Sequence, residues 1–372
     1  MFRALGLATT ALITIPTLVA AGGIERSPPS TRVLFEEGRY VELSFSLVGP
    51  DVDGVGGLLD PTGSGTGELL EGFANYGAAY KADIGKGLSY AFIFDTPYGS
   101  DTLYPTVATS GYSGTASDLD AFQLSAILAY DINERVKVYG GARLQSIEAT
   151  AFFPFFGLLG TPPAPGVTYD VDGNRDYSLG YMFGAAYQIP DIAGRVALTY
   201  YSAIDHDLDT TENIVGPPTL SNTEVETPQS INLEFQSGIA QNTLLFGSVR
   251  WVEWSEFAIS PAAFTGAVGV PLVAYADDTF TYTLGLGHRF NENWSGAVQV
   301  TYEPATDAIP FTTLGPVDGF TSIGLAATYT MDNLEITGGI TYADLGETQN
   351  FAGTVFDDGD AFGIGVRLGY SF

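Results

Sequence analysis

The last segment of the chain, residues 356–372, reads FDDGDAFGIGVRLGYSF and decides the fold class. Its large apolar residues recur at every second position: Phe356, Phe362, Ile364, Val366, Leu368, Tyr370 and Phe372. The alternate positions hold mostly Gly, Ala and Ser, together with Asp357 and Arg367. A period of two residues predicts a β-strand. Because the second face carries small residues rather than Lys and Glu, we expect it to line a crowded interior.

The same alternation recurs along the chain, with aromatic residues concentrated near the ends of the segments. It predicts fourteen strands, at residues 39–48, 72–83, 87–96, 117–131, 136–149, 174–189, 195–206, 224–238, 242–256, 276–290, 293–303, 319–331, 333–346 and 356–372. The connections alternate between short and long. An even number of strands with short turns at one end and long loops at the other is typical of outer-membrane barrels. In a membrane such a sheet must close, because an open edge would leave backbone groups unpaired.

The composition supports a membrane barrel and excludes several classes of function. Charged residues make up only 15% of the chain, whereas soluble proteins carry about 25%. The net charge of -29 argues against binding to nucleic acid, which requires a basic surface. The chain has no Cys, so disulfide scaffolds, thiol nucleophiles and Cys-ligated zinc are excluded. We expect no cofactor.

The N-terminus resembles a secretory signal peptide. Arg3 precedes an apolar run from Leu5 to Val19, and Val19-Ala20-Ala21 offers a small-residue cleavage site. The alternative is a membrane helix, for which this run is short. We therefore expect a signal peptide at residues 1–21, a short plug remnant at 22–38 and a transmembrane barrel at 39–372.

From Val225 onward the chain resembles the long-chain fatty-acid transporter (FadL) family. The similarity is carried by Glu226-Thr227-Pro228-Gln229-Ser230, by Val249-Arg250-Trp251-Val252-Glu253-Trp254-Ser255-Glu256-Phe257, and by the stretch from Leu284 to Trp294. It implies a fourteen-stranded barrel in the bacterial outer membrane that takes up hydrophobic molecules passively. The family usually has an N-terminal plug of some forty residues with an Asn-Pro-Ala turn. Here only about Gly22 to Gly38 is available, with Ser27-Pro28-Pro29 at the turn, so we expect a reduced plug.

The third long connection is the first candidate for the binding site. It contains the apolar residues Phe152, Phe153, Phe155, Phe156, Leu158 and Leu159. An apolar patch of this kind outside a membrane requires an explanation. In the family the corresponding loop contributes to substrate capture, so the resemblance implies a capture groove here. The alternative is a loop that buries itself and caps the barrel.

The end of the third strand is the second candidate. Pro97 cannot donate a backbone hydrogen bond, and Gly99 permits a bulge beside Tyr98. The family's third strand is kinked near this point, which opens the wall sideways to the bilayer. The resemblance thus implies a lateral opening at Pro97, Tyr98 and Gly99. The alternative is that the strand simply stops.

Three arginines, Arg143, Arg250 and Arg367, share strand faces with small or polar residues and are expected to point inward. Arg143 and Arg250 are our candidates for a forked contact with a fatty-acid carboxylate. The alternative is an internal salt bridge, with Glu148, Glu234, Glu335 and Asp357 as possible partners.

The sequence offers no catalytic constellation, so we do not expect an enzyme. His206 and His288 are its only histidines, and neither is placed for a catalytic triad. The carboxylates at Asp205, Asp207 and Asp209 could bind Ca²⁺, but an acidic rim is the simpler interpretation, because no Gly turn or bidentate Glu follows.

The sequence therefore predicts passive uptake of hydrophobic small molecules, in particular long-chain fatty acids, across the outer membrane. Expected partners are the surrounding lipids and lipopolysaccharide. The barrel-assembly machinery is a further one, because Gly369-Tyr370-Ser371-Phe372 resembles its C-terminal signal. The alternatives are a general porin for polar solutes and a structural or adhesive barrel.

Overall fold

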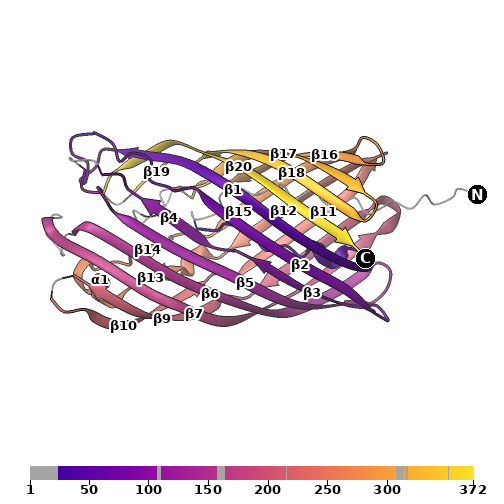
Figure 1. The fold of residues 1–372 in the computed structure, drawn as a ribbon, viewed down its shortest axis with the longest axis horizontal. Coiled ribbons are helices and arrows are strands. Elements are labelled where there is room, and N and C mark those ends of the chain that lie inside the picture. The colour runs from indigo at the N-terminus through magenta and orange to yellow at the C-terminus, as the bar shows by residue number, and fades with distance from the viewer. Residues whose placement is uncertain are drawn as a thin grey trace, which may run out of the picture.

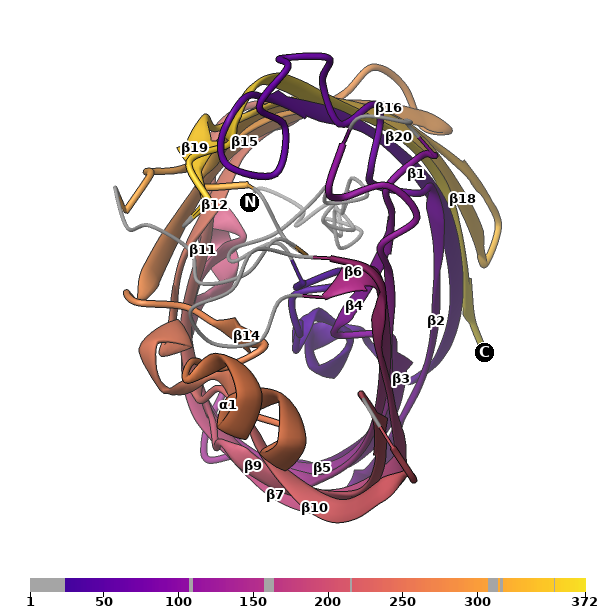
Figure 2. The same ribbon diagram turned by 90° about the vertical axis from the view of Figure 1, so that its left-hand side faces the viewer.

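The two-residue alternation becomes a closed ring of antiparallel strands. The computed structural model describes residues 24–106, 110–156, 164–214, 216–306, 314, 317–350 and 352–372. Strand β1 (Arg39–Val55) pairs with β20 (Val355–Ser371) from Tyr40↔Ser371 to Val55↔Val355, which closes the barrel. Figures 1 and 2 show this ring from the side and from its long-loop end.

The barrel has fourteen strands, as the alternation predicted. Three of them are interrupted and each consists of two segments: β3 (Leu88–Asp95) with β4 (Gly99–Leu103), β8 (Gly194–Tyr201) with β9 (Ile204–Asn213), and β10 (Thr219–Thr227) with β11 (Ser230–Ala240). The others are β1, β2 (Phe73–Gly85), β5 (Ala116–Asp131), β6 (Val136–Phe156), β7 (Ala164–Ile189), β12 (Thr243–Val252), β15 (Thr279–Arg289), β16 (Trp294–Glu303), β17 (Phe320–Met331), β18 (Leu334–Leu345) and β20.

In the part of the chain that the structure describes, seven short elements lie inside the barrel or at its two ends. They are η2 (Arg32–Phe35), η3 (Pro190–Ile192), η4 (Trp254–Glu256), β13 (Ala258–Ile259), α1 (Ala262–Val268), β14 (Val273–Ala274) and β19 (Thr348–Gln349). Figure 1 places α1 and β19 at the end opposite the C-terminus. Among the described residues, no helix has the length and apolar character needed to cross a membrane.

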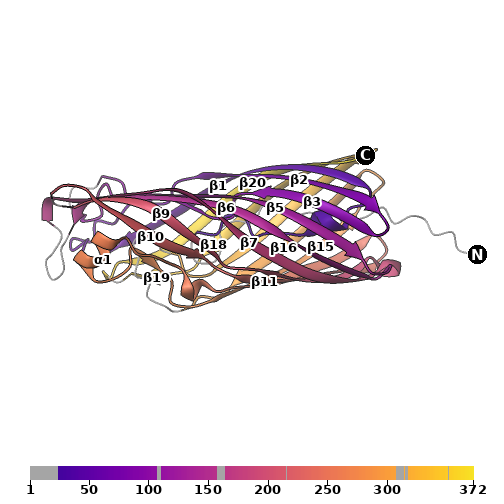
Figure 3. The ribbon, with the colours of Figure 1, turned by 90° about the horizontal axis from the view of Figure 1, so that it is seen from below.

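Two segments that we predicted as long loops are largely strand. β6 continues to Phe156 and β7 begins at Ala164, inside the predicted loop 150–173. β9 and β10 likewise fill most of the predicted loop 207–223, with Asp207 opposite Glu224. We predicted strands from alternating apolar residues, and this alternation ends where the outward positions become acidic. The backbone hydrogen bonds between the strands nevertheless continue through these segments. In Figure 3 this wall reaches the level of α1.

The N-terminal segment Ile24–Gly38 lies inside the barrel. Figure 2 shows its short helix η2 within the ring of strands. The Lys137 ammonium donates to the carbonyl of Leu34 at 2.8 Å, and the amide of Asn232 donates to the carbonyl of Pro29 at 2.9 Å. This segment is therefore hydrogen-bonded to the inner faces of β6 and β11 and occupies part of the interior.

The outward face provides a first test of the fold. Leu286 on β15 is exposed on the outer surface, whereas Gly287 points inward, where an added Cβ would meet atoms only at 3.9 Å or beyond. We expect Leu286→Arg to destabilise the barrel in a bilayer by about 2–4 kcal/mol. Gly287→Ser should have little effect. Unfolding from liposomes measures both, and equal destabilisation would mean that the two faces are assigned the wrong way round.

Candidate functional site

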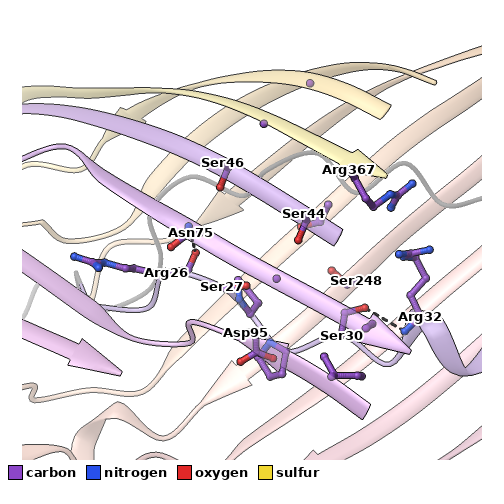
Figure 4. A pocket seen from close by; sticks show the side chains of 18 of the residues that line it. Arg26, Ser27, Ser30, Arg32, Ser44, Ser46, Asn75, Asp95, Ser248 and Arg367 are labelled. Atoms are coloured by element: carbon purple, nitrogen blue, oxygen red, sulfur yellow. Dashed lines mark hydrogen bonds between the residues drawn. The ribbon is translucent and has the colours of Figure 1, made fainter. Parts of the chain in front are cut away.

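The barrel interior contains a cavity of about 350 Å³ beside the N-terminal segment, and charged side chains form part of its wall. Arg26, Arg32, Arg195, Arg250 and Arg367 line it, together with the acids Glu25, Glu42, Glu234 and Asp95. Figure 4 shows part of this lining. The strands contribute many small residues to this lining, and Arg250 and Arg367 point inward, as the alternation indicated. The sequence analysis did not anticipate the charged side chains of the N-terminal segment, which fill the room that the small residues leave.

The charges of this cavity largely neutralise one another. The carboxylate of Glu25 pairs with the guanidinium of Arg250, with a distance of 3.2 Å between Nε and Oε2. Arg250 also donates to Ser230 at 3.0 Å and to Asn232 at 2.6 Å. Both members of the ion pair are buried. Arg250 therefore has an internal partner, although Glu25 was not among the acids that we considered.

A second hollow, the apolar chamber, lies towards the long-loop end. Its volume is about 50 Å³. Its walls are mainly apolar and comprise Ile24, Ser100, Ser117, Asp118, Leu119, Ala149, Thr150, Ala151, Val171, Gly173, Leu208, Thr210, Thr223, Phe257, Ile259, Pro261, Leu272, Val273, Tyr275 and Leu314. Because Ile24 is part of its wall, the chamber meets the N-terminal segment.

The walls of the chamber are formed by the ends of β4, β5, β6, β7, β9 and β10. Its lid is formed by the segment Phe257–Tyr275, which we call the cap. Inward positions such as Val171 and Leu208 stay apolar beyond the ends of the predicted strands, where the outward neighbours Asp170, Asp172, Asp207 and Asp209 are acidic. Within the cap, Ile259 pairs with Val273 across β13 and β14. Helix α1 between them ends at Gly269, whose φ of +87° suits glycine. Figure 2 shows α1 and β14 across part of the barrel mouth.

One buried carboxylate fixes the cap to the wall. Glu212 on β9 accepts hydrogen bonds from the backbone amides of Ala263 and Phe264, both at 2.8 Å. It also accepts one from the hydroxyl of Tyr169 on β7 at 3.0 Å. A carboxylate at the first turn of a helix satisfies amides that lack partners within the helix. The cap is thus anchored to the sheet rather than resting loosely on it.

The third strand is interrupted at the predicted position. β3 ends at Asp95, β4 begins at Gly99, and the backbone between them turns to the N-terminal segment. The carbonyl of Pro97 accepts from the amide of Arg26 at 2.8 Å, and the amide of Gly99 donates to the carbonyl of Ile24 at 2.8 Å. A β-bridge joins Tyr98 to Glu25.

This detour leaves a window in the backbone ladder between the second and third strands. Residues Phe73–Gly77 of β2 pair with β1, but the pairing of β2 with β3 starts only at Ala78↔Phe94. Pairing resumes beyond the window, where the amide of Glu71 donates to the carbonyl of Asp101 at 3.0 Å.

Side chains fill the window. Thr96 donates to the side-chain oxygen of Asn75 at 3.3 Å, and the amide of Asn75 donates to the carbonyl of Arg26 at 3.1 Å. The guanidinium of Arg26 lies 4.5 Å from the centre of the Phe73 ring and 2.6 Å from an oxygen of Asp101. A Cβ on Gly99 would collide with this guanidinium, so glycine permits Arg26 to cover the window.

The predicted capture residues are only partly described. Phe152 lies on the outer surface, whereas Phe153 packs on Tyr169 and on Phe264 of the cap, with ring centres 6.1 and 6.3 Å apart. The side chains of Phe155 and Phe156, as well as Leu158 and Leu159, lie outside the part of the chain that the structure describes.

Arg143 is buried and points inward, as predicted. It donates to the side-chain oxygen of Gln123 at 2.7 Å and to the carbonyl of Ser202 at 3.0 Å, and it lies 5.3 Å from the centre of the Tyr201 ring. Among the described residues, no carboxylate lies within salt-bridge distance of it. Neither Arg143 nor Arg250 lines the apolar chamber.

Sequence reasoning missed the cap as part of the site. The segment 257–275 contains a long apolar stretch beyond the strands, with Phe257, Phe264, Leu272 and Tyr275 among its members. Like the apolar residues of the Phe152 loop, these residues require a partner, because an exposed apolar stretch is unfavourable in water. That signal was sufficient to identify the cap.

Comparisons with known proteins support this architecture. The chain is similar to a FadL homologue of Pseudomonas aeruginosa, with 15% identity, 92% of each chain covered and a TM-score of 0.75. It is also similar to the toluene transporter TbuX of Ralstonia pickettii (15% identity, 91% and 90% covered, TM-score 0.63). A third similar structure is the toluene transporter TodX of Pseudomonas putida (12% identity, 93% and 92% covered, TM-score 0.66).

No curated protein sequence matches the chain. The family model described as outer membrane protein transport protein (OMPP1/FadL/TodX) matches residues 68–354, which is most of the chain. The protein therefore belongs to the OMPP1/FadL/TodX family of outer membrane transport proteins.

Proposed function

We propose that this outer-membrane barrel takes up hydrophobic small molecules by capturing them in the apolar chamber and releasing them sideways through the window. The proposal depends above all on one observation: the chamber adjoins the window. Ile24 and Ser100 line the chamber, and both lie next to the residues that interrupt the third strand. No energy-coupling segment is needed for such a route, because the concentration gradient drives it.

The polarity of the interior favours the sideways route. Below the chamber lie the N-terminal segment and the charged cavity. An apolar molecule that enters this cavity loses the contacts of the chamber, and each methylene group that leaves an apolar environment costs about 0.8 kcal/mol. A molecule that passes from the chamber into the bilayer keeps an apolar environment at both ends of its path.

Within this class, long-chain fatty acids are the substrate suggested by the sequence, and aromatic hydrocarbons are the second. The similar proteins include both a FadL homologue and toluene transporters. A fatty acid requires a partner for its carboxylate, and Arg143 is the candidate because Glu25 already neutralises Arg250. Uptake of labelled oleate and labelled toluene should be compared directly.

The chamber wall provides the test of this function. Leu272 of the cap is buried and lines the chamber, so Leu272→Asn removes part of its apolar surface. Burial of a Leu side chain contributes about 1.5–3 kcal/mol, and we expect uptake at limiting substrate to fall about tenfold or more. Uptake into cells that lack their own transporter measures this effect.

The matched control is Leu58→Asn. Leu58 is exposed in the β1–β2 connection and does not line the chamber. This variant should transport at the parental rate. If the parental barrel folds in the membrane but admits neither oleate nor toluene above the background, the proposed function is refuted.

A further inference from the structure

Two hydrogen-bond donors, one lining the apolar chamber and one beside it, have no acceptor among the described residues. The hydroxyl of Tyr275 and the indole N–H of Trp254 are both buried, and within that part of the chain neither has a hydrogen-bond partner. Trp254 is fully buried, with 0% of its surface exposed. Leaving a buried polar group unsatisfied costs about 1–3 kcal/mol. Such groups at a binding site indicate that a ligand supplies the missing partner.

These donors belong to one aromatic cluster, formed by Tyr98, Trp254, Phe257 and Tyr275. The ring of Trp254 packs edge-on against Tyr98, Phe257 and Tyr275, with centres 5.9, 5.6 and 5.3 Å apart. Phe257 and Tyr275 line the apolar chamber, and Tyr98 lies at the window. The cluster therefore extends along the path that we propose for the transported molecule.

The electrostatics of the chamber determine which acceptor fits. Its lining contains one charged residue, the acid Asp118, and no Lys or Arg among the described residues. A carboxylate placed there would lose its hydration without gaining a cation, which is unfavourable in an apolar site. Burial raises the pKa of the Tyr275 phenol well above its usual range, so this hydroxyl stays protonated and remains a donor.

We propose that Tyr275 and Trp254 form a polar subsite for an uncharged oxygen, such as that of a ketone, ester, ether or alcohol, on an otherwise apolar molecule. This inference rests on the proposed function and narrows its substrate class to molecules with an uncharged oxygen in the chamber. A fatty-acid carboxylate would have to lie outside the chamber, because Arg143 does not line it. An uncharged oxygen accepts one or two hydrogen bonds at little desolvation cost, and the surrounding rings bind the apolar remainder.

The test compares two ligands that differ in one oxygen. Acetophenone and ethylbenzene have similar size and shape, but only acetophenone has a hydrogen-bond acceptor. Their dissociation constants are measured on the purified full-length barrel by equilibrium dialysis. Tyr275→Phe should lower the preference for acetophenone about threefold to tenfold, the range of one neutral hydrogen bond, and leave ethylbenzene binding unchanged. Because this variant removes only an unsatisfied hydroxyl, its thermal stability should not decrease.

Two further variants complete the design. Trp254→Phe removes the second donor and should change the preference in the same direction. Tyr282→Phe, an exchange on the outer surface of β15, is the matched control and should leave the preference unchanged.

The possible outcomes separate this inference from the proposed function. If the parental barrel binds both ligands and Tyr275→Phe leaves their ratio unchanged, water satisfies the donors and the subsite is refuted alone. Tighter binding of benzoate than of acetophenone would also overturn it. If the parental barrel binds none of the three ligands but imports oleate, the subsite is refuted alone. The proposed function fails as well only if the barrel also admits neither oleate nor toluene.

Discussion

A covalent bridge between positions 75 and 96 should reduce uptake of hydrophobic molecules to the level of vesicles without the protein. Asn75 and Thr96 face each other across the window, with their side-chain oxygens 3.3 Å apart. The natural chain has no Cys, so Asn75→Cys combined with Thr96→Cys creates the only thiols. A short bifunctional thiol reagent then fixes β2 to the third strand and closes the sideways route. Uptake is measured before and after the reagent.

The control is a bridge where the ladder is already closed. Ala79 and Ile93 are directly opposite each other on β2 and β3, one step beyond the window. The double variant Ala79→Cys and Ile93→Cys should transport equally well before and after treatment. If the bridge at positions 75 and 96 forms completely and uptake continues, the molecule leaves towards the periplasm rather than through the wall.

Removal of the Glu25 side chain should release the N-terminal segment and open the barrel to polar solutes. Glu25→Ala leaves the guanidinium of Arg250 buried without a countercharge, and breaking a buried pair in this way costs about 3–5 kcal/mol. Such a cost changes the ratio of closed to open barrels more than a hundredfold, since about 1.4 kcal/mol corresponds to tenfold. Conductance in planar bilayers and entry of bulky polar antibiotics both measure the effect.

Two control variants test whether loss of the ion pair causes the increase in conductance. The double variant Glu25→Leu with Arg250→Met replaces the ion pair with apolar side chains and should remain closed, because such replacements are often neutral. Glu224→Ala removes an exposed acid of β10 and should not alter conductance. If Glu25→Ala conducts no better than the parental barrel, other contacts of the segment suffice to hold it in place.

The sequence predicted the parts of the fold that depend on local pattern. In β20, Ile364 and Val366 face outward and Arg367 faces inward, as their alternation indicated. The faces are readable because a strand in a bilayer must present apolar residues to lipid at every second position. The search for outward apolar residues did not identify the parts of β6, β7, β9 and β10 nearest the long-loop end. There the outward positions are largely polar or acidic, because they lie beyond the bilayer.

The site was harder to predict because its contacts join distant parts of the chain. Glu25 and Arg250 are 225 positions apart, and no periodicity links them. The chamber likewise combines Ile24, strand residues such as Leu208 and the cap residue Leu272. The interruption at Pro97 was visible in the sequence, but the role of Gly99 depends on the position of Arg26, which only the folded chain reveals.

The anchoring of the cap by Glu212 has a consequence for how this barrel can diversify. The chamber walls are strands of the barrel, whereas its lid is one contiguous segment between β12 and β15 that Glu212 and the packing of Phe264 hold against the wall. Exchange of that segment leaves the cylinder and its membrane contacts intact. Selection can therefore alter the chemical range of the imported molecules by replacing one segment that lines the chamber, without changing the strands that cross the membrane.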